Sequence, residues 1–394
     1  MAGEAPGGTP GGVPGGVPGG VPGGAPGGVR AAARINLAAI ERNSARLARA
    51  SPLLCAVVKA NAYGHGAVEC SRAALAGGAS WLAVAAAAEA QELRDAGVAA
   101  RILLMGALTR AELELALAAD ADVVAWSDEF LDWLDGLGGG RVHVKLDSGM
   151  GRLGTRDVAL ADALAARIAA TEALELVGAM THLATAEEPD RSFMEAQIER
   201  FASWVGPLRD RHPGLIAHAE NSAALLGAGQ ARFDMARCGG AVYGLDPYGG
   251  DPGDWGLEPA LELRSWVAAL KHCEVGDSAG YGRRFVAAEP TELAVVPIGY
   301  GDGLRRLLSN NAEVLIGGRR RALVGTVSMD NVTVDLGLGS GVTVGEPVIL
   351  LGVDGRERIG AEEIAARQGT INYEITCAVS PRVPRDYHRD GAHP

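Results

Sequence analysis

Lys59 is the residue of this sequence with the clearest potential for chemistry. Only three lysines occur among 394 residues, against 33 arginines, and Lys59 ends a short apolar run. A guanidinium stays protonated at any ordinary pH, whereas an amine can lose its proton and attack a carbonyl carbon. Burial at the end of an apolar strand would lower the pKa of the amine and favour that reaction. We therefore predict a nucleophilic lysine here; the alternative is an ordinary surface lysine at a strand end.

Other polar residues also follow short apolar runs in the first two thirds of the chain. They are Lys145, Asp147, Thr181, His182, Asn221, Ser222 and Arg237. Taken singly, each has an ordinary structural explanation, such as a hydrogen-bonded core histidine or a solvated loop charge. Whether they form one site depends on how the apolar runs are arranged in space.

Between residue 36 and about residue 260, short apolar runs alternate with alanine-rich segments of helical periodicity. The eight predicted strands are residues 55–59, 81–85, 101–105, 122–126, 142–147, 176–182, 215–221 and 234–239. Eight strand–helix units in roughly 225 residues favour a (β/α)8 barrel over an open doubly wound sheet. The carboxyl ends of all barrel strands lie on one face, so the polar residues would meet there.

After about residue 260 the sequence has short or alternating apolar segments broken by glycine and aspartate. Segments 293–298, 313–316, 322–327, 332–336 and 347–351 predict a mostly β second domain. We therefore expect a barrel over residues 29–260 and a β domain over residues 261–394. Residues 1–28 repeat proline at every fourth position with glycines between, a composition typical of a disordered tail.

Charge and composition limit the class of partner and the compartment. A net charge of -12 argues against nucleic acid, because phosphate backbones are bound by clustered basic residues. The five cysteines form neither a metal-binding spacing nor a disulfide framework, which favours a reducing cytoplasm. Neither a secretory signal nor an apolar run of membrane length is apparent. The predicted partner is therefore a small molecule, and no metal site is predicted.

Several motifs of the chain occur in the order found in one enzyme family. Residues 57–66, VVKANAYGHG, closely resemble the segment of the alanine racemases that carries the pyridoxal 5′-phosphate lysine. Further matching segments are 144–154 (VKLDSGMGRLG), 180–182 (MTH), 221–222 (NS), 237–244 (RCGGAVYG), 280–282 (GYG), 299–303 (GYGDG), 325–330 (GTVSMD) and 372–374 (NYE). The resemblance extends from about residue 32 to residue 387, and by these motifs the chain is identified as a member of the alanine racemase family.

The resemblance implies a fold, a reaction and an assembly. The fold is a barrel that binds pyridoxal 5′-phosphate, followed by a β domain, in agreement with the pattern of apolar segments. The implied reaction is the interconversion of L-alanine and D-alanine by a two-base proton transfer, which supplies D-alanine for peptidoglycan. A homodimer with shared active sites is implied as well, since the second base reaches the substrate from the partner's second domain.

Two residues are implied to exchange the proton on opposite faces of the substrate carbon. Lys59 would hold the cofactor covalently and act as one base, and Tyr281 would be the other. Two bases are needed because a carbanion that regains its proton on the same face returns the starting enantiomer. By resemblance, His182 bonds the tyrosine. The resemblance also implies that Arg237 lies at the cofactor's ring nitrogen and keeps it unprotonated.

The other matched residues are implied to hold the cofactor and the substrate. Arg152 would contact the cofactor's phenolic oxygen and the substrate carboxylate, assisted by the backbone amide of Met329. Lys145 matches a lysine that carries a carbamate in several family members and orients the arginine. Phosphate binding would fall to Tyr63, Ser222, Gly239, Gly240 and Tyr373, and the cofactor-binding set also includes Asn221 and His182.

Two other classes of protein share part of this pattern. Non-catalytic homeostasis proteins that bind pyridoxal phosphate resemble the barrel alone, without a domain carrying Tyr281 and Tyr373. Barrel-type amino-acid decarboxylases place a carboxylate at the ring nitrogen, where this chain has Arg237.

Serine or a basic amino acid remains an alternative substrate within the racemases. We interpret the remaining candidates as structural: Lys271, His65, His143, His212 and His218.

Overall fold

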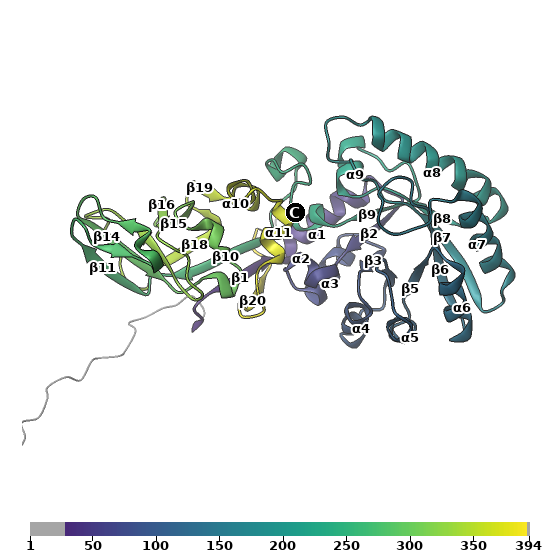
Figure 1. Ribbon diagram of the computed structural model, residues 1–394, viewed down its shortest axis with the longest axis horizontal. Coiled ribbons are helices and arrows are strands. Elements are labelled where there is room, and N and C mark those ends of the chain that lie inside the picture. The colour runs from purple at the N-terminus through teal and green to yellow at the C-terminus, as the bar shows by residue number, and fades with distance from the viewer. Residues whose placement is uncertain (1–27, 392–394) are drawn as a thin grey trace, which may run out of the picture.

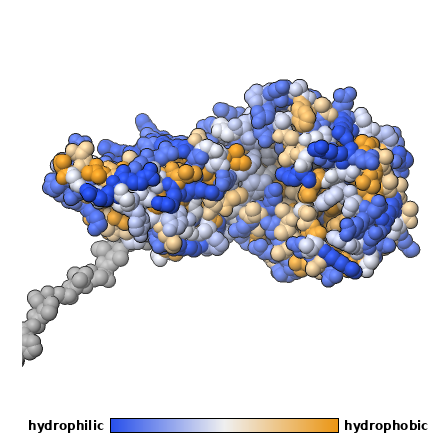
Figure 2. Space-filling view, in the orientation of Figure 1, coloured by the Kyte–Doolittle hydropathy of each residue, from blue (hydrophilic) through white to orange (hydrophobic). Residues whose placement is uncertain are grey.

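The computed structural model describes residues 28–391, so the predicted tail lies outside the described residues except for Gly28. The described chain has two bodies, a barrel surrounded by helices and a β-rich domain beside it (Figure 1). Hydrophilic residues cover most of the visible face of both bodies, and hydrophobic areas there are small and separate (Figure 2). Most buried apolar side chains form instead one core cluster that includes residues of both bodies.

Eight parallel strands form the barrel and confirm the eight that the apolar runs predicted. They are β2 Leu53–Val57, β3 Trp81–Val84, β4 Arg101–Leu104, β5 Asp122–Ala125, β6 Gly140–Lys145, β7 Leu174–Met180, β8 Ile216–His218 and β9 Met235–Cys238. Their order is β8-β7-β6-β5-β4-β3-β2-β9. Backbone hydrogen bonds from Asp234 to Ala217 and from Arg237 to Glu220 connect the two end strands. The predicted barrel is therefore present and nearly closed.

Helices cover the outside of the barrel and several begin at a capping side chain, whereas the short α2 is a turn that follows β2. They are α1 Leu37–Ala48, α2 Lys59–Tyr63, α3 Ala67–Ala76, α4 Ala87–Asp95, α5 Arg110–Ala118, α6 Asp128–Gly136, α7 Val158–Ala170, α8 Ser192–Arg211 and α9 Ser222–Ala228. The side chains of Ser127 and Asp157 accept hydrogen bonds from the first turns of α6 and α7, which satisfies donors that a helix start leaves free. Among the residues described, no helix is long and apolar enough to cross a membrane.

The second domain is mostly β, as predicted. Its main sheet contains β1 Ala32–Asn36, β10 Leu261–Trp266, β11 Ala269–Cys273, β14 Thr291–Val296, β15 Ala312–Ile316, β16 Arg319–Val324, β17 Val332–Asp335, β18 Pro347–Asp354, β19 Glu357–Ile359 and β20 Arg385–His388. A small sheet of β12 Ser278–Ala279 and β13 Phe285–Val286 extends from it, and helices α10 Ala361–Gln368 and α11 Asn372–Cys377 follow β19 in the chain.

Strand β1 connects the beginning of the described chain to the second domain. It pairs antiparallel with β10 and parallel with β20. The predicted barrel range, residues 29–260, included this strand, whereas the structure places it in the second sheet. Helix α1 follows β1 directly and packs on α3 of the barrel. This segment therefore ties the two domains together.

Candidate active site

A cavity of about 660 Å³ lies at the carboxyl ends of the barrel strands, with α10 and α11 along one side. The lining includes Glu362 of α10 and Ile371 just before α11. Ten of the predicted site residues line this cavity: Lys59, Tyr63, Arg152, His182, Asn221, Ser222, Arg237, Gly239, Gly240 and Tyr373. Residues far apart in the sequence are thus brought to one place, which we take as the candidate active site.

Lys59 begins an unusual turn at the end of strand β2. Residues Ala60 to Tyr63 all have φ between 52° and 54°, so they form a left-handed helical turn. This conformation costs roughly 1–2 kcal/mol for each non-glycine residue. Side chains hold it in place: Glu89 Oε1 accepts from the Ala60 amide at 2.6 Å, and Asn61 Oδ1 accepts from the Ala67 amide at 2.8 Å. The turn directs both Lys59 and Tyr63 into the cavity.

The amines near the cavity are in surroundings that favour their neutral form. Burial and the charge of Arg152 lower the pKa of Lys59. Burial and the charge of Arg237 lower the pKa of Lys145 to about 8. Over residues 28–391, neither amine has a carboxylate within ion-pair distance. These surroundings therefore favour the neutral form of both amines, and for Lys59 this is the nucleophilic form.

The loop that carries Arg152 is organised by Asp147 at the end of β6. The Asp147 carboxylate accepts from the amides of Gly149 and Gly151 at 3.1 and 3.0 Å and pairs with Arg156 at 3.1 Å. Arg152 itself is exposed, and no described carboxylate pairs with it. Its guanidinium is free to bind an anionic ligand in the cavity.

Arg237 occupies the buried floor of the cavity and sets the state of His182. Its guanidinium donates to the carbonyl oxygen of Thr181 at 2.7 Å and to His182 Nδ1 at 3.2 Å. A guanidinium can only donate, so Nδ1 accepts and the imidazole proton lies on Nε2. Burial and the charge of Arg237 hold the pKa of His182 well below its usual value. Burial lowers the pKa of Arg237 to about 10, which leaves it charged at neutral pH.

Glycine backbone and hydroxyl groups form one wall of the cavity. Ser222 Oγ accepts from the amides of Gly239 and Ala241 at 3.1 and 3.4 Å, so its hydrogen is left to donate to a ligand. A methyl group added at Gly239 would overlap the ring of Tyr63, and one added at Gly240 would overlap the ring of Tyr373. Burial raises the pKa of both tyrosine hydroxyls, which therefore remain donors. Such converging donors suit a phosphate group.

Three predicted residues have other places in the structure. Tyr281 and Met329 lie on the second domain with 73% and 51% of their surface exposed, and neither lines the cavity of its own chain. Lys145, at the end of β6, is buried behind the cavity lining. Asn221 lines the cavity, but its side-chain oxygen also caps α9 by accepting from the Ala224 amide at 3.0 Å.

Comparison with known proteins agrees with this geometry. The family described as "Alanine racemase, N-terminal domain" matches residues 35–247, and "Alanine racemase, C-terminal domain" matches residues 260–387. The chain belongs to the alanine racemase family. The alanine racemase of Thermobifida fusca is 42% identical over 91% of this chain and 98% of that protein. That of Symbiobacterium thermophilum is 40% identical over 90% and 96%.

Solved structures of alanine racemases share the fold. The crystal structure from a D-cycloserine-producing Streptomyces lavendulae has a TM-score of 0.85 and 36% identity, and the match covers 91% of this chain and 97% of that one. The structure from Streptomyces coelicolor has the same TM-score and identity, with coverage of 92% and 98%. The predicted family and fold class are both confirmed.

The contribution of some residues to this candidate site was not predicted from the sequence. Glu89 and Asn61 hold the left-handed turn, and His143 and His218, interpreted above as structural, form a hydrogen-bonded pair below Arg237. The alternation of side chains between the two faces of strand β6 could have indicated the place of His143. His143 precedes Lys145 by two residues, so both side chains point to the same face of that strand.

Proposed function

We propose that the protein is an alanine racemase that uses pyridoxal 5′-phosphate to interconvert L-alanine and D-alanine. The observation that carries the proposal is the convergence of Lys59, Arg237 and the glycine wall on one cavity. When bound, the cofactor supplies a conjugated ring that withdraws electrons from the substrate and so acidifies its alpha C–H bond. In a cell, the activity would supply D-alanine for peptidoglycan. The cytoplasmic location expected from the cysteine composition stays a prediction.

The residues of the cavity fit this cofactor in charge and shape. Lys59 would hold it covalently and Arg237 would face its ring nitrogen. The phosphate would be bound by the hydroxyls of Tyr63, Ser222 and Tyr373 and the amides of Gly239 and Gly240, with Asn221 beside them. The overlap that any side chain at the two glycines would make with the tyrosine rings supports this assignment, because the wall leaves room for a ligand only against bare backbone.

Two bases would work from opposite faces of the alpha carbon. The Lys59 amine would exchange the proton on one face, and Tyr281 would do so on the other. Because Tyr281 is exposed and lies outside the cavity of its own chain, we propose that it enters the cavity of the partner subunit in a homodimer. The Nε2–H of His182 would then donate to the tyrosine oxygen, which favours the phenolate that a base requires.

Arg237 favours a racemase over a decarboxylase. Its described polar partners are carbonyl oxygens and imidazoles, so the group facing the cofactor ring would be a cation. A guanidinium holds its proton too tightly to give it to the ring nitrogen, so the bound cofactor would be a weaker electron sink and charge would stay at the alpha carbon. The proton would then return to that carbon.

The substrate carboxylate would be bound by Arg152 and by the backbone amide of Met329 from the partner subunit. We propose that Lys145, whose pKa of about 8 makes its amine partly neutral, reacts with carbon dioxide to form a carbamate. The resulting anion would orient the Arg152 guanidinium. Preference for alanine over serine or a basic amino acid is part of this proposal.

The proposal is tested by incubating the purified protein with L-alanine in heavy water while chirality and alpha-proton exchange are followed. L-serine and L-lysine are assayed in parallel. Exchange with inversion, fastest for alanine, is the expected result. Release of carbon dioxide would indicate a decarboxylase, and bound cofactor without turnover would indicate a homeostasis protein.

A further inference from the structure

A chain of four buried side chains runs through the barrel interior from the active site toward its opposite end. The Arg237 guanidinium lies 2.9 Å from Nδ1 of His218, and Nε2 of His218 lies 2.9 Å from Nδ1 of His143. Nε2 of His143 lies 3.3 Å from an oxygen of Asp122. These residues come from β9, β8, β6 and β5, and each is nearly or fully inaccessible to solvent.

The two end residues of this hydrogen-bonded series, Arg237 and Asp122, determine which nitrogen of each histidine carries the hydrogen. Arg237 can only donate, so Nδ1 of His218 must accept and its Nε2 must carry the proton. That Nε2–H donates to Nδ1 of His143, which leaves the proton of His143 on Nε2. There it meets the Asp122 carboxylate, which only accepts. Both imidazoles are therefore neutral, and each carries its hydrogen on Nε2.

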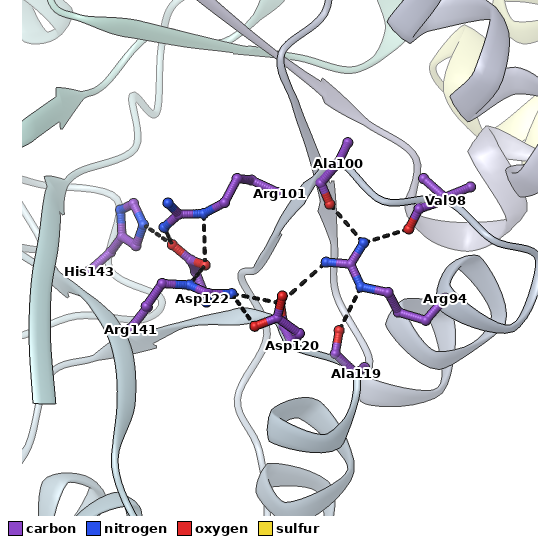
Figure 3. A network of polar contacts seen from close by, with 9 residues as sticks. All are labelled: Arg94, Val98, Ala100, Arg101, Ala119, Asp120, Asp122, Arg141 and His143. Carbon is purple, nitrogen blue, oxygen red and sulfur yellow. Dashed lines mark hydrogen bonds and ion pairs between the residues drawn. The ribbon is translucent and has the colours of Figure 1, made fainter. Parts of the chain in front are cut away.

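Asp122 is held as a carboxylate at the amino end of β5, on the side of the barrel away from the cavity. Arg141 Nε donates to it at 2.7 Å, and Arg101 forms a second ion pair with it (Figure 3). Burial would raise the pKa of this carboxyl, but the hydrogen bonds from His143 and the two arginines together hold the pKa at about 2. The Asp122 carboxylate therefore stays ionised, and remains a hydrogen-bond acceptor, at any pH near neutrality.

We propose that Asp122, His143 and His218 are positioning residues for Arg237, acting as a relay of fixed hydrogen-bond direction. The relay keeps a lone pair of His218 facing the guanidinium. If either imidazole carried its hydrogen on Nδ1, the direction would reverse and an N–H of His218 would face the guanidinium. Arg237 would then lose a buried acceptor and shift from the position where the proposed function needs it.

The consequence for the reaction rests on the proposed racemase function, whereas the direction of the relay does not. A displaced Arg237 would no longer keep the ring nitrogen unprotonated, so transamination should increase relative to racemisation. His143 also packs edge-on against Trp81, with ring centroids 5.7 Å apart, so a pure packing role is the competing explanation.

The direction is tested by nuclear magnetic resonance of the full-length protein labelled with ¹⁵N in histidine, with and without cofactor. His143 and His218 should both be Nε2–H tautomers, unchanged between mildly acidic and mildly alkaline pH. An Nδ1–H tautomer or an imidazolium at either position overturns the relay. This measurement needs no turnover, so it decides the relay even if the racemase assay fails.

Two substitutions separate the relay from packing. His143→Gln can still accept from His218 and donate to Asp122, whereas His143→Leu can do neither. We expect His143→Gln to keep the His218 tautomer, and His143→Leu to raise the ratio of transamination to racemisation about tenfold, the size expected for losing one buried hydrogen bond to a charged group. An unchanged ratio in His143→Leu, or a larger change in His143→Gln, would show that packing is the role.

The carboxylate end is tested by Asp122→Asn, with Asp120→Asn as the matched control. In the Asp122→Asn variant, the new amide oxygen should turn toward the two arginines and the NH₂ group toward His143, which converts His143 to the Nδ1–H tautomer. Asp120 pairs with Arg141 at 2.7 Å, but its carboxylate takes no part in the hydrogen bonds of His143. Asp120→Asn should therefore leave both tautomers unchanged. Persistence of Nε2–H tautomers in Asp122→Asn would show that Arg237 alone sets the direction and would exclude Asp122 from the relay.

Discussion

The ring of Tyr373 lies directly against the backbone of Gly240, with no room for even a methyl group between them. This contact is part of the wall that we assign to the cofactor's phosphate. Gly240→Ala should push the Tyr373 ring away and weaken binding of pyridoxal 5′-phosphate by about tenfold or more, since buried overlaps of this kind cost roughly 1–3 kcal/mol. Equilibrium titration of the apoprotein, followed by cofactor absorbance, measures the change.

Gly136→Ala is the matched control for this substitution. Gly136 is exposed at the end of α6, its φ is ordinary, and an added methyl group would meet nothing within 4 Å. Its replacement should leave cofactor binding unchanged and stabilise the helix slightly, by roughly 0.5–1 kcal/mol. An equal loss of cofactor affinity in both variants would show that the phosphate does not bind at the glycine wall.

Replacing Lys59 by arginine should abolish racemase activity. The variant keeps a long basic side chain, but a guanidinium neither binds the cofactor covalently nor exchanges a proton near neutral pH. We expect a fall in kcat of at least about a thousandfold, within the range for losing a general base, together with loss of the visible absorbance of bound cofactor. Lys271→Arg, at an exposed position on β11, should change neither quantity. Retained activity in Lys59→Arg would refute the central assignment.

Mixed dimers test whether Tyr281 serves the partner's site. Lys59→Arg and Tyr281→Phe subunits should each be nearly inactive alone. In a mixed dimer, one site combines Lys59 of the Tyr281→Phe subunit with Tyr281 of the Lys59→Arg subunit, so that site is intact. Random equal mixing should restore up to about a quarter of wild-type activity, because half of the dimers are mixed and each has one good site. If Tyr281 acted within its own chain, every site would carry a defect and no activity would return.

The barrel could be predicted from the sequence because its signals are local. Each strand is a short apolar run such as Trp81–Val84, and strong turn or capping residues separate it from the next helix. Strand β1 carried no such signal, since its partners β10 and β20 lie near the other end of the chain. Pairing over that distance depends on the complete fold.

The details of the site needed three-dimensional structure for similar reasons. Ala60 and Ala62 have little intrinsic preference for positive φ, so their left-handed turn is imposed by Glu89 and by the packing of the barrel. His143 and His218 are separated by 75 positions, and only closure of the barrel brings their rings together. Motif order could place Lys59 and Arg237 in one site but could not show what holds them.

Removing the carboxylate of Glu89 should loosen the turn that directs Lys59. Its two oxygens accept from the amides of Ala60, Ala85 and Ala86 at 2.6, 2.8 and 3.1 Å. Glu89→Ala should lower the free energy of unfolding by about 2–3 kcal/mol, as expected for hydrogen bonds to a charged acceptor, and should also reduce kcat. Denaturant unfolding and the racemase assay measure the two effects.

Glu92→Ala provides the control within the same helix. Glu92 is exposed on α4, and its carboxylate accepts no hydrogen bond from any described residue. We expect its replacement to change stability by less than about 0.5 kcal/mol. If Glu89→Ala behaves in the same way, the left-handed turn is held by packing alone.

Lys145 should show a conflict between stability and activity that depends on pH. Its pKa falls from an ordinary 10.5 to about 8 because of burial and Arg237, so the fold disfavours the charged amine. This penalty is present in full below about pH 8 and disappears as the pH rises to the unfolded value of 10.5.

In buffer free of carbon dioxide, Lys145→Met should therefore raise the free energy of unfolding on the order of 1–3 kcal/mol at pH 7. The gain should shrink toward pH 10.5. In buffer that contains bicarbonate, the variant should be less active as a racemase than the wild type, because it cannot form the anion that orients Arg152. Lys271→Met, at an exposed site, should show no such pH dependence. A gain at Lys145 that is equal at both pH values would assign the effect to packing rather than to the buried charge.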